Sequence, residues 1–101
     1  MKVYMVLFDW STTDDEAVEV EHFDSYTKAH ERFCEIILNE QNPDMSWVGE
    51  EAFEIDGRIR DGYIFDSNED LSGETDLWWN VTDESDYNRH SFIDLKVMEV
   101  K

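Results

Sequence analysis

The segment DSYTKAHERFCEIILNEQ, residues 24–41, decides the fold of this chain because it carries one apolar stripe at helical spacing. Asp24 or Ser25 can cap its start, since either side chain accepts hydrogen bonds from the free N–H groups of the first turn. Pro43 lies just beyond its end, as is common where helices stop. The sequence therefore predicts one main helix over about residues 25–41, with this buried stripe: Tyr26, Ala29, Phe33, Ile36 and Ile37.

The residues before this helix predict a β-hairpin. Residues 2–10 are apolar on both faces, which is typical of a central strand. Residues 11–15 form a polar turn, and in residues 16–23 Val18 and Val20 alternate with glutamates. We expect two antiparallel strands joined by this turn.

The residues after the helix predict four more strands, at 51–56, 62–66, 76–82 and 91–100. The neighbours Trp78 and Trp79 must point to opposite faces of their strand, so one should lie in the core and the other outside. The order β-β-α-β-β-β-β predicts an α+β fold. We expect a single domain over residues 1–101, with an antiparallel or mixed sheet of about four to six strands and the helix packed on it.

The charge of the chain is strongly negative. Its 101 residues hold 26 acids and 8 bases, a net charge of −18, which equals the charge on roughly 30 Å of duplex DNA. Residues 33–88 alone carry sixteen acids and two bases. This balance argues against direct binding of nucleic acid or anionic lipid, and no apolar run is long enough to span a membrane.

No motif indicates catalysis or a cofactor. The chain has no glycine-rich phosphate loop and no Gly-x-Ser-x-Gly element. His30 and Cys34 are spaced to share a helix face, but a zinc site needs two further ligands. We therefore expect a non-catalytic protein without cofactor or metal site. As the single cysteine, Cys34 excludes an internal disulfide and fits a reducing cytoplasm.

One segment resembles the start of a calcium-binding loop. Asp66, Asn68 and Asp70 occupy the first, third and fifth ligand positions of such a loop. Leu71 stands where the glycine is required and Leu77 where the final glutamate is required, so an EF-hand is excluded. Only a weak site for a hard cation is left open.

The acids of residues 33–88 are interleaved with aromatic residues, so this region is no simple acidic tail. Its acids form either a solvated outer face or a surface that meets a cationic partner. An outward tryptophan beside carboxylates would serve as an interface anchor. The candidate partner-binding residues are Asp44, Trp47, Glu50, Glu51, Glu54, Asp56, Asp66, Glu69, Asp70, Glu74, Asp76 and Trp78.

In size, charge and α/β pattern the chain resembles the small acidic inhibitors encoded by phages and mobile elements, among them anti-CRISPR and anti-restriction proteins. The resemblance covers overall character and the acidic 33–88 region, and no functional residue is carried over from it. It implies a cytoplasmic inhibitor that mimics nucleic acid and occludes the cationic cleft of a basic nucleic-acid-binding protein, such as a CRISPR effector or another nuclease.

Two other interpretations stay open. The chain fits an immunity protein or antitoxin that neutralises a cognate toxic enzyme, because such proteins use the same charge complementarity. It also fits an acidic domain whose charge serves solubility alone. The sequence does not fix the oligomeric state.

Overall fold

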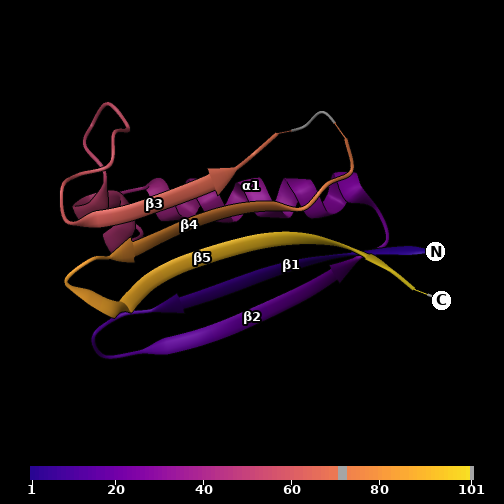
Figure 1. The fold of residues 1–101 in the computed structure, drawn as a ribbon, viewed down its shortest axis with the longest axis horizontal. Helices are drawn as coiled ribbons and strands as arrows, with labels where there is room; N and C mark the ends of the chain where they lie inside the picture. The colour runs from indigo at the N-terminus through magenta and orange to yellow at the C-terminus, as the bar shows by residue number, and fades with distance from the viewer. Residues whose placement is uncertain (71–72, 101) are drawn as a thin grey trace.

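The sheet is built around strand β5 (Asp86–Glu99), which pairs antiparallel with β1 (Lys2–Ser11) on one side and with β4 (Leu77–Asp83) on the other. Strands β2 (Glu16–Phe23) and β3 (Tyr63–Asn68) form the two edges, which gives the order β2-β1-β5-β4-β3. This computed structural model describes residues 1–70 and 73–100 (Figure 1). The predicted α+β fold is confirmed, and β1 is an interior strand as expected, next to the middle strand β5.

Helix α1 (Tyr26–Gln41) has the predicted bounds and packs its apolar stripe on one face of the sheet. The Ser25 side chain caps it, accepting a hydrogen bond from the Lys28 N–H at 3.3 Å. Ala29, Phe33, Ile36 and Ile37 are buried, and Tyr26 is half-buried. In Figure 1 the helix lies behind β3 and β4.

The core lies between α1 and the sheet, and Trp79 is its largest fully buried side chain. Phe53 stacks on Trp79 with the ring centroids 5.8 Å apart, and Phe65 meets Trp79 edge-on at 5.7 Å. Trp78 is half-exposed on the opposite face of β4, which confirms that the two tryptophans separate.

The predicted strand at 51–56 is wrong. Residues Val48–Ala52 form a single π-helical turn, η1, and only Phe53 makes a β-bridge, with Ile59. The reason is packing: Val48 and Ala52, four residues apart, are both fully buried against the core. Gly49 allows this approach, because a Cβ at that position would lie 2.4 Å from the Gln41 carbonyl oxygen.

The predicted start of the last strand at residue 91 is also wrong, because β5 begins at Asp86 and residues 84 and 85 form the turn before it. The Asp83 carboxylate holds this tight turn together. Its Oδ1 accepts hydrogen bonds from the backbone N–H and the hydroxyl of Ser85, at 2.9 and 2.7 Å. The described part of the chain contains no helix long and apolar enough to cross a membrane.

Candidate partner-binding surface

The predicted binding residues fall into two groups that β3 separates (Figure 1). The "η1 group" lies at the start of β3, and the "β3–β4 loop group" lies at its end, beside the first turn of α1. Asp66 and Trp78 lie between them, in β3 and β4. The η1 group is Asp44, Trp47, Glu50, Glu51, Glu54 and Asp56, and the β3–β4 loop group is Glu69, Asp70, Glu74 and Asp76.

Two members of the η1 group are held by an arginine. The Arg89 guanidinium lies 4.5 Å from the ring centroid of Trp47 and donates to Glu51 Oε2 at 2.6 Å. It also donates to Asp83 Oδ2 at 2.9 Å. Burial lowers the pKa of Arg89, but Glu51 and Asp83 outweigh it and raise that pKa above its ordinary value. Trp47 and Glu51 thus tie η1 to the β4–β5 hairpin.

The rest of the η1 group faces solvent. Asp56 and Glu54 lie 2.8 and 3.9 Å from the Arg58 guanidinium, whose side chain is 78% exposed, so water screens both ion pairs. Asp44 and Glu50 are exposed, and among the described residues neither forms an ion pair within 4.0 Å. These four carboxylates are accessible to a cationic partner.

The β3–β4 loop group is partly engaged in structure. Glu74 accepts a hydrogen bond from the Tyr4 hydroxyl at 2.6 Å and lies 3.7 Å from the Lys2 ammonium. Asp76 accepts from the Val97 N–H at 2.8 Å, beside the sheet. Glu69 and Asp70 are exposed. Residues 71 and 72 of this loop lie outside the described residues, and with them the sixth position of the calcium-loop pattern.

Trp78 lies beside an acid of the neighbouring strand. Its indole Nε1 donates to Asp66 Oδ2 at 3.1 Å, across the β3–β4 pairing. The indole ring is half-exposed on the sheet face opposite α1. An aromatic surface next to a carboxylate suits a cationic side chain, which can meet both at once.

The structure also brings together acids that the sequence did not single out. Asp9 lies 3.0 Å from His90 Nε2, and the His90 ring stacks on Phe92 with centroids 4.4 Å apart. Asp94 lies in register with Leu7 on one side and Trp78 on the other. Burial raises the pKa of Asp94, Lys96 lowers it, and the charges of Asp76 and Asp9 raise it further. The alternation of residues along β1 and β5 could have placed Asp9 and Asp94 on one sheet face. The sequence does not give the strand register that brings them close together.

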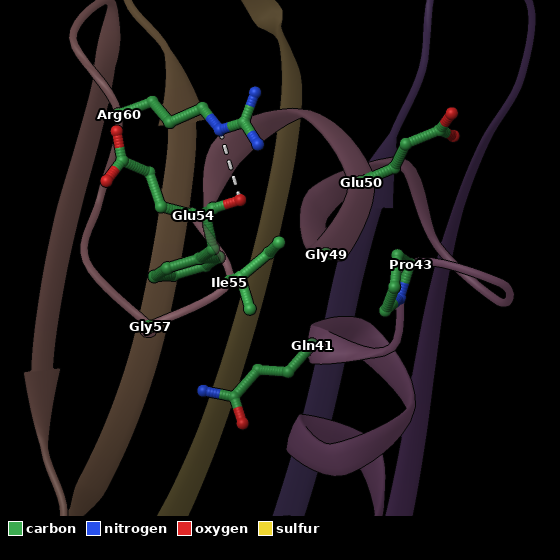
Figure 2. Close-up of a pocket in the computed structure, with 9 residues that line it drawn as sticks. Gln41, Pro43, Gly49, Glu50, Glu54, Ile55, Gly57 and Arg60 are labelled. Carbon is green, nitrogen blue, oxygen red and sulfur yellow. Dashed lines mark hydrogen bonds between the residues drawn. The ribbon is translucent and has the colours of Figure 1, made fainter.

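A pocket of about 440 Å³ opens between the end of α1, η1 and the 53–60 loop (Figure 2). Phe53, Pro43 and Ile55 contribute apolar surface to it. Glu50, Glu54 and Arg60 stand around it, and the Arg60 Nε donates to the Phe53 carbonyl at 3.1 Å. Ile55 is fully exposed at a turn where Gly57 takes a positive φ of 87°. The pocket has room for one side chain that has an apolar stem and a positively charged end. The charged end would lie near Glu50 and Glu54.

Cys34 and His30 lie side by side on α1. Cys34 Sγ lies 3.5 Å from His30 Nε2, but burial raises the pKa of the thiol, and Glu69 raises it further. A reactive thiolate needs the opposite environment. No group of three or more His, Cys, Asp or Glu among residues 1–70 and 73–100 is placed to hold a metal ion.

Comparison with known proteins finds no matching family model, no matching curated protein and no matching solved structure.

Proposed function

We propose that this protein is a non-catalytic inhibitor that binds the cationic nucleic-acid-binding surface of a partner, such as a CRISPR effector or another nuclease. The observation that carries the proposal is the charge along β3 and its flanking segments. Residues 44–76 hold eleven acids and two arginines. Such a surface would attract a partner whose arginines and lysines normally contact phosphates.

The dimensions of the molecule support this proposal. Its longest axis is 42 Å, so a net charge of −18 amounts to about one charge per 2.3 Å, against one per ~1.7 Å in B-DNA. Within β3 itself Asp66 is the one acid, so the carboxylates of residues 44–76 lie mainly in the segments at the two ends of this edge strand. A cationic cleft would meet them at both ends.

Few bases offset these acids. Five of the bases form ion pairs with acids of this chain: Lys2, Lys28, Arg32, Arg58 and Arg89. The neighbouring acids therefore offset the positive charge of these bases, and the charge that remains unpaired is negative. Long-range attraction would make association with a cationic cleft fast and sensitive to salt.

The test uses two variants with the same net charge. The site variant carries Asp44→Asn, Glu50→Gln and Glu69→Gln, which lie beyond the two ends of β3. The matched control carries Glu16→Gln, Glu19→Gln and Glu31→Gln, on β2 and α1. All six residues are exposed, so folding should survive.

The tagged protein is first used to capture its partner from a host lysate on a rising salt gradient, and the partner is then purified. The expected result is that the wild type competes with duplex DNA or guide RNA for that enzyme, and that the site variant competes at least tenfold less well while the control matches the wild type. If both variants compete equally poorly, the inhibition depends on net charge alone and the proposal is overturned. Recovery of a toxic enzyme that is blocked without competition for nucleic acid would favour an immunity protein instead.

A further inference from the structure

One face of the sheet is not covered by any element in the described part of the chain. Helix α1 packs on the other face, and the register places alternate residues of all five strands on the uncovered one (Figure 1). We call this surface the open face. Its apolar members are Val3, Met5, Leu7, Val18, Val20, Ile64, Trp78, Phe92 and Met98, and its acids include Asp9, Asp66 and Asp94.

Half of the open face carries an apolar strip along β2, β1 and the end of β5, in which His22 lies opposite Met5 and Asp9 lies opposite Val18. Val20 is in register with Leu7, and Val3 with Met98. Val18, Val20 and Met98 are 62%, 45% and 43% exposed, so the strip is accessible. Covering apolar surface yields ~25 cal/mol per Å², and contiguous apolar patches on a monomer generally mark interaction sites.

The other half of the open face contains an acidic hollow beside Trp78. The hollow has a volume of about 270 Å³, and its lining includes Asp66, Asp76, Asp94 and Lys96. Three carboxylates therefore face one lysine. Asp94 is half-buried, and an incoming cation would offset the unfavourable environment of its charge.

The distance between the two halves defines the shape of the ligand. The strip is centred between β2 and β1, and the hollow lies between β5 and β4, two strand spacings away, or about 10 Å. On an α-helix, residues seven apart lie on the same face and about 10.5 Å apart. A helix with apolar side chains at one place and a cation seven residues further on would contact both halves.

We propose that the open face is a docking surface for a basic amphipathic helix of a partner protein. The leucine-type side chains of the helix lie on the apolar strip, and an arginine or lysine enters the hollow, beside Trp78 and against Asp94. A helix that contacts both halves would run across the strands, whereas α1 runs along them on the other face (Figure 1). This surface shares Asp66, Asp76 and Trp78 with the acidic 44–76 region but lies apart from the η1 group, and the proposal does not depend on nucleic-acid mimicry.

Charge decides between such a helix and a second copy of this chain. In a two-fold dimer of open faces, the acids of one copy would meet either the acids or the apolar strip of the other, and each copy carries a net charge of −18. A basic helix brings opposite charge to the same carboxylates.

The test uses a synthetic helical peptide with a pair of leucines and an arginine seven residues after the first, and a twin peptide with citrulline in place of arginine. Binding to the full chain is measured by NMR titration and calorimetry at 150 mM salt. The expected result is that shifts concentrate on β1, β2, β4 and β5 and that citrulline weakens binding at least fivefold. Asp94→Asn should abolish this difference between the peptides, whereas the exposed helix control Glu31→Gln should leave it unchanged.

Apolar variants test the other half of the face. The double change Val18→Ser and Val20→Ser should weaken peptide binding at least tenfold, whereas Met45→Ser and Ile55→Ser, at more exposed positions elsewhere, should not. No binding at millimolar peptide, or equal losses in the paired variants, would overturn the proposal. A free protein that sediments as a dimer, and becomes monomeric on the Val18 and Val20 changes, would assign the face to a second copy instead.

Discussion

The guanidinium of Arg89 lies 4.5 Å above the ring centroid of Trp47 and at the same time forms ion pairs with Asp83 and Glu51. One side chain from β5 thereby joins the η1 turn to the β4–β5 hairpin. Its side chain is 20% exposed, so these contacts are partly shielded from water.

Replacing Arg89 should destabilise the fold. Arg89→Gln leaves Asp83 without its cation and uncovers Trp47, and we expect a loss of about 1–3 kcal/mol in the free energy of unfolding. Arg58→Gln, which removes the same charge at an exposed site, should cost less than about 0.5 kcal/mol. Urea unfolding followed by tryptophan fluorescence measures both, and equal losses would contradict a structural role for Arg89.

Neutralising Asp94 should stabilise the protein at neutral pH. The pKa of Asp94 is raised above its ordinary value of 3.8, chiefly by burial. Its carboxyl therefore favours the folded state below that value, and this contribution is lost as pH rises through the folded pKa. Asp94→Asn should raise Tm by a few degrees at pH 7 and lose this advantage below pH 3.8. A lower Tm for the variant at pH 7 would show that the charge is well solvated.

The Asp83 turn should respond to pH in the opposite direction. The Ser85 hydroxyl, more than any other group, holds the pKa of Asp83 below its ordinary value of 3.8. That contribution to stability is present above pH 3.8 and is lost as pH falls through the lowered folded pKa. Ser85→Ala should cost about 1 kcal/mol at pH 7 and progressively less as the solution is acidified. Thermal unfolding at a series of pH values tests this, and a cost that does not change with pH would rule the linkage out.

Asn80 should be replaceable with a gain in stability. Its side-chain oxygen is buried and has no hydrogen-bond partner among the described residues. Asn80→Val removes this unpaired acceptor and places a β-branched residue in β4, so we expect about 1 kcal/mol of added stability. Asn68→Val is the matched control, because it removes bonds to the Asp70 N–H and the Asp76 carbonyl and should destabilise. Loss of stability in both variants would mean that the side-chain oxygen of Asn80 accepts a hydrogen bond in solution.

Cys34 should react slowly with thiol reagents. Burial and, after it, the charge of Glu69 raise the pKa of the thiol, which lowers the thiolate fraction at neutral pH. The rate of iodoacetamide labelling at pH 7.5 should be at least tenfold below that of the same protein in urea. His30→Ala should leave the folded rate nearly unchanged, and a rate that collapses in this variant would indicate an activated Cys34–His30 pair.

Helix α1 and the β1–β2 hairpin could be predicted from sequence because their signals are local. The stripe from Ala29 to Ile37, the Ser25 cap and Pro43 need only neighbours within a few turns. The segment at 51–56 could not be predicted, since its short apolar run fits a strand or a helical turn equally well. The buried Val48 and Ala52 and the close approach of Gly49 to Gln41 decided it.

Some features of the candidate binding surface could likewise be predicted from the sequence, and others could not. Net charge, its concentration in residues 33–88 and the opposite orientations of Trp78 and Trp79 follow from composition and the period of a strand. The ion pairs of Glu51 with Arg89 and of Glu74 with Lys2 join residues 38 and 72 positions apart in the chain, and no local pattern encodes them.

The sequence by itself determined the fold class, the helix and the sign of the charge, because each depends on composition or on short-range periodicity. Only the tertiary structure decided which acids remain accessible and which acids gather on the open face around Trp78. Strand register sets those neighbours, and register depends on how β1, β4 and β5 pair across the whole chain.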